Sequence, residues 1–154
     1  MNTSAATPAL PTDQLLAAIG KLQAQINNIA PPVWVDAASI GTTHAAFTGL
    51  QFAKINGLLW VRGSFSASAS INVGTNLFLL TNPTYRLNMH PDLAFAIKLG
   101  EVLAFSFETN SKRILQLRNV LNSANYFSLN NEAAIGSNLS GLIQPTAIGR
   151  LLTP

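Results

Sequence analysis

Five large apolar residues near the N-terminus, spaced alternately four and three positions apart, constrain this chain more than any other feature: Leu15, Ile19, Leu22, Ile26 and Ile29. A repeat of about 3.5 residues places all five side chains along one seam of an α-helix. Such a seam is stabilised when it packs against the same seam of another helix, and a helix of this length is only marginally stable alone in water. The spacing therefore predicts a helix that mediates self-association.

The predicted helix covers residues 12–30. Thr12 or Asp13 can cap its first backbone amides, and a carboxylate is favourable at the positive end of the helix dipole. Two consecutive prolines at positions 31 and 32 end the helix, because proline lacks a backbone N–H and restricts the residue before it. Residues 1–11 are small, polar and interrupted by proline, so we expect an extended arm that can attach the chain to other proteins.

The heptad positions bear on how many helices associate. With Ile19 and Ile26 at position a, the remaining seam residues fall at d, and this mixture of Ile and Leu does not choose between two and more strands. Leu16 falls at e and widens the apolar stripe, as a three-stranded bundle requires. We therefore predict a parallel homotrimer held by six residues: Leu15, Leu16, Ile19, Leu22, Ile26 and Ile29. The alternative is that the seam packs on the β-rich part of the same chain.

Residues 31–154 have the pattern of short strands. The dipeptide Asn56-Gly57 predicts a two-residue hairpin turn, because both residues tolerate positive φ, and the apolar residues after it alternate. A second hairpin is expected around Thr109–Ser111. Further strands are expected at residues 34–36, 67–73, 77–81, 93–99, 126–129 and 139–143. About eight or nine short strands at this spacing predict a mainly β domain, an antiparallel β-sandwich of jelly-roll type.

The composition favours an assembly. Charged residues make up 10% of the chain and apolar residues 48%, whereas about 25% charged residues is usual. A surface with so little charge is poorly soluble unless part of it is covered. The net charge of +3 comes from nine Lys and Arg that are scattered singly, apart from Lys112-Arg113, so we expect no nucleic-acid binding.

The sequence contains no cysteine, which excludes disulfides and thiolate metal sites but leaves the redox compartment undetermined. No run of about 18 apolar residues is present, and the N-terminus lacks the features of a signal peptide. We therefore expect synthesis in a cytoplasm without export and no membrane insertion.

No residue pattern indicates catalysis. The two histidines, His44 and His90, have no second ligand at metal spacing, although Asp92 lies two positions after His90. The six carboxylates are dispersed, and neither a nucleophile elbow nor a glycine-rich phosphate loop occurs. We expect no enzyme activity, no metal and no cofactor.

Aromatic residues are the candidates for ligand contact. Trp60, Tyr85 and Tyr126 lie among Asn, Ser and Thr, so their rings can stack on sugar rings while neighbours bind hydroxyls. Arg86 follows Tyr85, and Arg62 lies near Trp60. The alternative is that these aromatic residues pack in the core or between subunits.

One segment resembles a known class of proteins. In residues 57–87 an alternating strand with glycine precedes a polar stretch, a Leu-rich strand and a Pro-x-Tyr-Arg turn, carried by Gly57, Trp60, Gly63, Phe65, Leu79, Leu80, Pro83, Tyr85 and Arg86. This pattern resembles the terminal domains of bacteriophage tail-fibre and tail-associated proteins, over roughly a fifth of the chain. It departs from them at Leu87, where proline is common.

The resemblance implies a homotrimeric knob on a helical stem, displayed on a virion and made in the host cytoplasm, without cofactor or covalent catalysis. As a receptor-binding head it would contact a host-surface glycan or protein, and trimeric display would add avidity. As a capsid decoration protein it would stabilise the shell, with the N-terminal arm attached to other virion proteins. The roughly 30 residues before the β domain suit a short projection better than a long fibre. A free trimeric lectin-like protein is the third alternative.

Overall fold

The computed structural model describes residues 15–27, 31–89, 98–106, 111–120, 123 and 125–152. The chain divides into two compact units, residues 1–32 and residues 33–154. We call the second unit the head.

The N-terminal unit contains helix α1, Leu15–Asn27. The helix therefore forms where the apolar spacing predicts it. Residues 12–14 and 28–30 of the predicted helix, which include the expected caps and Ile29, lie outside the described residues, as does the expected arm at residues 1–11.

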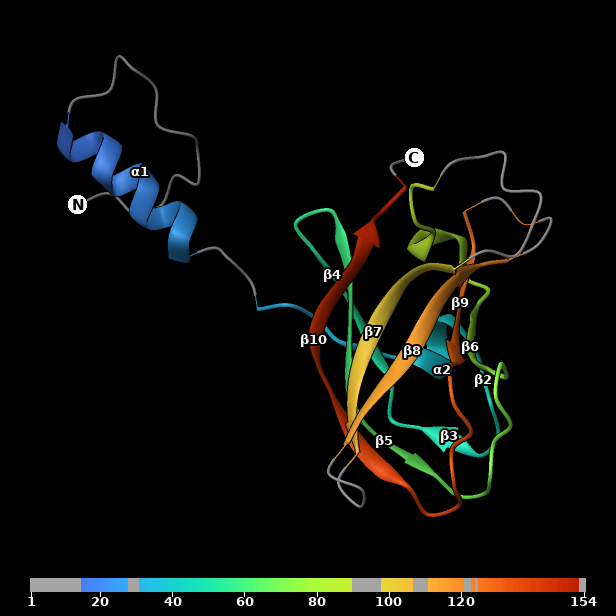
Figure 1. Cartoon of the computed structure of the whole chain (residues 1–154). Coiled ribbons are helices and arrows are strands. Elements are labelled where there is room, and N and C mark those ends of the chain that lie inside the picture. The colour runs from blue at the N-terminus through green and yellow to red at the C-terminus, as the bar shows by residue number, and fades with distance from the viewer. Residues whose placement is uncertain are drawn as a thin grey trace. The chain divides into compact units, whose positions relative to one another are not determined.

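The described part of the head is mainly β, and its ten strands join one antiparallel sheet (Figure 1). The strands are β1 (Val35–Asp36), β2 (Gly41–Thr43), β3 (Phe47–Thr48), β4 (Gln51–Ile55), β5 (Leu58–Ala67), β6 (Asn76–Leu80), β7 (Lys98–Ser106), β8 (Ser111–Asn119), β9 (Phe127–Asn131) and β10 (Ser140–Arg150). Their order in the sheet is β1-β4-β5-β10-β7-β8-β9-β6-β2, and β3 pairs with β5 beside this path. The described residues of this unit also form two short helices, helix α2 (Ala37–Ile40) and the 3-10 helix η1 (Pro83–Tyr85).

The sheet curls because its two end strands are joined by α2. β1 and β2 lie at opposite ends of the strand order, yet only the four residues of α2 separate them in sequence. The Ala37 N–H donates to the Leu50 carbonyl next to β4, and the Ile40 carbonyl accepts from the Thr81 N–H just after β6. The two edges therefore approach each other across α2, and Figure 1 shows the resulting half-barrel. These pairings form one continuous sheet and do not confirm the expected two-sheet sandwich or jelly roll.

The predicted Asn56-Gly57 hairpin is confirmed, and so is the antiparallel strand pairing of the second predicted hairpin, although Ser111 of its expected turn belongs to β8. Asn56 and Gly57 have φ of 51° and 75° and connect β4 to β5 in antiparallel register, from Gln51 opposite Arg62 to Ile55 opposite Leu58. β7 and β8 also pair antiparallel along their length. The turn between them, at residues 107–110, lies outside the described residues.

The remaining strand predictions have mixed outcomes. β1, β6, β9 and β10 begin within about one residue of the expected positions, but β10 continues to Arg150. The strand expected at 67–73 is wrong: Ala67 ends β5, and Ile71 makes only an isolated bridge to Ile135. Most of the strand expected at 93–99 lies outside the described residues, and β7 is described from Lys98.

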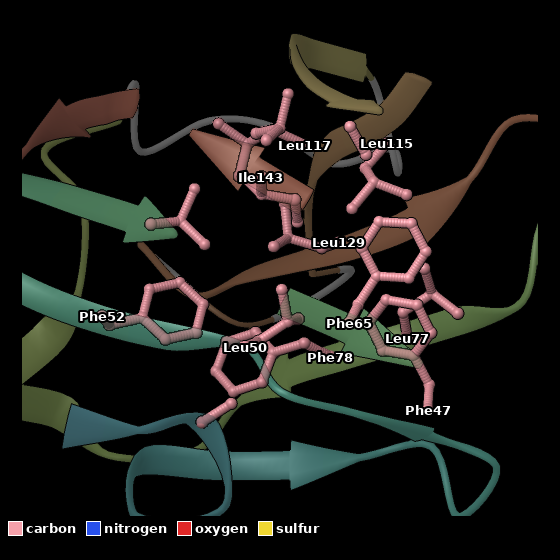
Figure 2. Close-up of a cluster of buried hydrophobic side chains, with 14 of the residues drawn as sticks. Phe47, Leu50, Phe52, Phe65, Leu77, Phe78, Leu115, Leu117, Leu129 and Ile143 are labelled. Carbon is pink, nitrogen blue, oxygen red and sulfur yellow. The ribbon is translucent and has the colours of Figure 1, made fainter. Parts of the chain in front are cut away.

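The core lies on the inner face of the curled sheet. On β5 the buried residues alternate as predicted, with Leu59, Val61 and Phe65 directed inward. Three phenylalanine rings from β4, β6 and β9 meet at centroid distances of 4.7 to 6.1 Å, and Phe47 stacks on Phe65 at 5.3 Å. Figure 2 shows ten labelled residues of this cluster: Phe47, Leu50, Phe52, Phe65, Leu77, Phe78, Leu115, Leu117, Leu129 and Ile143.

Two glycines allow close backbone packing next to this core. Gly49 and Gly63 have φ of +99° and +144°. A Cβ atom on Gly63 would lie 1.9 Å from the Gly49 carbonyl oxygen, and a Cβ on Gly49 would lie 1.9 Å from the Ser64 carbonyl oxygen. Glycine is therefore required at both positions for the chain before β4 to pass so close to β5.

Candidate functional site

The seam of α1 is exposed in the single chain. The exposed fractions are 75% for Leu15, 74% for Leu16, 42% for Ile19, 50% for Leu22 and 60% for Ile26. By contrast, Ala24 on the same helix is buried. A contiguous apolar stripe of this kind is characteristic of an interaction surface. Of the six residues predicted to mediate association, the five in the described helix are thus available to a partner.

Three of the four candidate ligand-contact residues gather around η1. The Lys54 ammonium lies 4.1 Å from the centroid of the Tyr85 ring, and the Arg86 guanidinium lies 5.8 Å from that of Tyr126. The Leu87 N–H donates to the Asn125 carbonyl at 3.0 Å, which holds the end of η1 beside the turn before β9. We call Lys54, Tyr85, Arg86 and Tyr126 the tyrosine cluster.

The fourth candidate, Trp60, lies on the other side of the sheet. Along β5 it alternates with Leu59 and Val61, which are fully buried in the core, so its side chain belongs to the outer face. Its register partners are Ala53 on β4 and Ala147 on β10. The indole Nε1 of Trp60 is buried and has no hydrogen-bond partner among the described residues.

A polar row crosses three strands beside Trp60. Asp36, Gln51 and Arg62 are register neighbours on β1, β4 and β5. The Arg62 Nε donates to Gln51 Oε1 at 3.2 Å, and Gln51 Nε2 donates to Asp36 Oδ1 at 3.1 Å. The Arg62 guanidinium also lies 4.1 Å from the centroid of the Trp34 ring. We call Trp34, Asp36, Gln51, Trp60 and Arg62 the tryptophan face.

Sequence reasoning identified only part of the tryptophan face. Trp60 was a candidate and Arg62 was noted beside it, but Trp34, Asp36 and Gln51 were not proposed as contacts. The Asn56-Gly57 turn does predict the position of Gln51, because a two-residue turn fixes the register of β4 against β5 and places Gln51 opposite Arg62. No such signal exists for Trp34 and Asp36. Asp36 lies in β1 and Trp34 directly precedes it, and this strand is only two residues long, so it has no periodicity of its own.

Among the other titratable groups, the contacts of His44 and Lys98 are described. The His44 Nδ1 accepts a hydrogen bond from the Ala46 N–H at 3.2 Å, and His90 lies outside the described part of the chain. No group of three His, Cys, Asp or Glu residues within the described ranges could hold a metal ion. Lys98 bonds to Glu101 and lies 3.6 Å from Glu132, and this contact with Glu101 raises the pKa of Lys98.

A small pocket opens between β8 and the segment after β9. It encloses about 220 Å³ and is lined by Arg113, Ile114, Leu115, Asn131, Glu132, Ala133 and Ile135. The Arg113 Nη1 donates to the Ala134 carbonyl at 2.8 Å, so this guanidinium supports the loop. Sites for small molecules usually measure about 300–1,000 Å³, and this pocket is smaller.

No protein-family model matches the chain, and no curated protein or solved structure matches it. Among the helices in the described residues, none has the length and apolar character needed to cross a membrane.

Proposed function

We propose that this protein is a non-enzymatic structural protein of a bacteriophage virion, which associates as a homotrimer through α1 and displays the head for attachment to a host surface. The exposed seam of α1 carries the proposal. The resemblance of residues 57–87 to tail-fibre terminal domains supports the virion assignment.

Self-association is supported by the stabilisation that burial of the seam would provide. Five large apolar side chains are between 42% and 75% exposed on one helix of 13 residues. Burial of apolar surface stabilises by about 25 cal/mol per Å², and a helix this short needs tertiary or quaternary packing to persist in water. Leu16 beside the seam gives a stripe wide enough for two neighbouring helices, which favours three strands over two.

Display for attachment is supported by the surface chemistry of the head. The head carries the tryptophan face on the outer side of the sheet and the tyrosine cluster, whose Tyr85 and Tyr126 are partly buried and pack against the core. Aromatic side chains with adjacent polar groups are typical of recognition surfaces. Three copies on one stem would bind a multivalent host surface far more tightly than one copy.

A binding experiment with matched variants tests this function. The full chain, the double variant Ile19→Asp/Ile26→Asp and the control Ala17→Asp are labelled and added separately to host bacteria, to non-host bacteria and to undecorated capsids. Ala17 is an exposed residue about half a turn from Ile26 around the helix, so its aspartate leaves the seam intact. We expect the full chain and the control to bind host cells and the double variant to bind at least about a hundredfold more weakly, because avidity is lost.

The other outcomes overturn the proposal. Stoichiometric binding to capsids without binding to cells would assign capsid decoration in place of attachment. Binding to neither target, or equal cell binding by the full chain and the double variant, would refute the trimeric attachment role.

A further inference from the structure

Both tryptophans of the chain lie together on the outer face of the sheet, away from the core. The chain contains two tryptophans, Trp34 and Trp60, and both are half-buried. Arg62, which alternates along β5 with the buried Val61, lies against the Trp34 ring, so Trp34 shares the outer face with Trp60. Core packing therefore does not account for either ring. Indole faces are the preferred stacking surfaces for the C–H faces of sugar rings because they are large, apolar and rigid.

The polar row next to these rings is held in place by its own hydrogen bonds. Gln51 accepts from Arg62 on one side and donates to Asp36 on the other, which fixes the orientation of all three groups. The two terminal amino groups of Arg62 and the second carboxylate oxygen of Asp36 have no hydrogen-bond partner among the described residues. These groups offer paired donors and an acceptor to neighbouring hydroxyls, and their prior orientation lowers the entropy cost of binding.

The charges on this face indicate the class of saccharide. The tryptophan face contains one cation, Arg62, and one anion, Asp36, linked through Gln51. A ligand carboxylate or sulfate would be attracted by the first and repelled by the second, so the pair gives no net preference for charge. The tyrosine cluster differs in charge, because it contains two cations, Lys54 and Arg86, and no anion.

We infer that the tryptophan face, in which the indoles of Trp34 and Trp60 adjoin the hydrogen-bonded row Asp36–Gln51–Arg62, is a binding site for a neutral saccharide. The inference deepens the proposed attachment function, because it names the chemical class of the host-surface group. Trimeric display would add avidity to the binding of each single site.

The two tryptophans make the site directly observable. The full chain is titrated with D-glucose, D-galactose, L-rhamnose and N-acetyl-D-glucosamine, with N-acetylneuraminic acid as the anionic comparison, and the indole N–H signals are followed by NMR. We expect at least one neutral sugar to shift these signals saturably. Trp34→Ala and Gln51→Ala should each weaken this binding at least about tenfold, while Val73→Ala, at an exposed residue outside both aromatic clusters, leaves it unchanged. Gln51 is partly exposed and lies outside the core, so its variant tests the site without removing core packing.

The results separate this inference from the proposed function. Signals that stay unmoved by every neutral sugar, a response to N-acetylneuraminic acid alone, or equal affinity in Gln51→Ala would each overturn the saccharide site. The same titration on Ile19→Asp/Ile26→Asp should give the same dissociation constant per site, because the site lies within one head. Loss of the sugar response in a chain that still binds host cells would refute the site and leave the attachment function in place.

Discussion

Replacing Gly63 by alanine should destabilise the head much more than replacing Gly57, although both glycines have positive φ. At Gly57 the φ is +75° and no atom lies within 4 Å of the position that a Cβ would occupy. At Gly63 the φ is +144°, and a Cβ would lie 1.9 Å from the Gly49 carbonyl oxygen. The two substitutions therefore add the same methyl group to an open turn and to a closed backbone contact.

The magnitudes follow from these two environments. Alanine in the left-handed conformation at position 57 costs about 1–2 kcal/mol. At position 63 the backbone strain costs about 1–3 kcal/mol, and forcing the two backbone segments apart adds about 1–3 kcal/mol more. Gly63→Ala should thus lose about 2–6 kcal/mol, which is a large part of the stability of a typical domain.

Equilibrium unfolding in urea measures this difference. Both tryptophans lie in the head, so their fluorescence reports its unfolding. With a slope of about 2 kcal/mol per molar urea, a loss of 4 kcal/mol lowers the midpoint by about 2 M, and Gly57→Ala should lower it by less than about 1 M. The protein concentration is kept constant because association also contributes to stability. Equal midpoints for the two variants would refute the close contact between Gly49 and β5.

Three further predictions concern the core, a turn and an ion pair. Phe52→Ala should cost about 3–5 kcal/mol in the same assay, because Phe52 is fully buried against two other phenylalanine rings, whereas a cost under about 1 kcal/mol would contradict its place in the core. Asn56→Gly should preserve stability within about 0.5 kcal/mol, since Asn56 has φ of 51°, while Asn56→Val should cost more than about 1 kcal/mol; equal effects would argue against the type I′ turn. The hydrogen bond to Glu101 raises the pKa of Lys98 above 10.5, so the stabilisation is complete below pH 10.5 and is lost as the pH rises through the raised pKa. The melting temperature of the wild-type chain should therefore fall between a pH below 10.5 and a pH above it, and that of Lys98→Met should fall by less. Identical pH dependence of the melting temperature in the two chains would contradict the role of Lys98.

The local features of the fold could be predicted from the sequence. The Asn56-Gly57 turn and the alternation of Leu59, Val61 and Phe65 act over neighbouring residues, so they specify the β4–β5 hairpin and its inner face. The apolar spacing in α1 is local in the same sense. In each case the side chains that determine the element lie within a few turns or one strand pair of each other.

Long-range features could not be predicted from local patterns. The curl of the sheet depends on α2, whose carbonyl and amide groups bond to segments on both edges of the sheet. β2 and β3 are three and two residues long and form through pairing with β6 and β5. β10 continues through Pro145 because the register shifts between Ile143 and Thr146, and such an irregularity tolerates a residue that cannot donate a ladder hydrogen bond.

The candidate site also combines residues that the sequence identifies with neighbours that only the strand pairing brings beside them. Tyr85 and Arg86 are adjacent in sequence, but Tyr126 lies beside them because the Leu87 and Met89 N–H groups donate hydrogen bonds to Asn125. Trp60 was identified by residue type, yet the polar row beside it requires β1 to pair with β4. Sequence therefore selects the aromatic residues, and the strand order decides which of them share a face.

The molecular mass of the full chain in solution tests the central claim most directly. Sedimentation equilibrium at several concentrations should give three times the chain mass of 16.4 kDa for the wild-type protein and for Ala17→Asp. Ile19→Asp/Ile26→Asp should give one chain mass with a folded head, because two carboxylates would be buried in each seam. A wild-type protein that remains at one chain mass across the concentration range would contradict the claim that α1 assembles the head into a trimer.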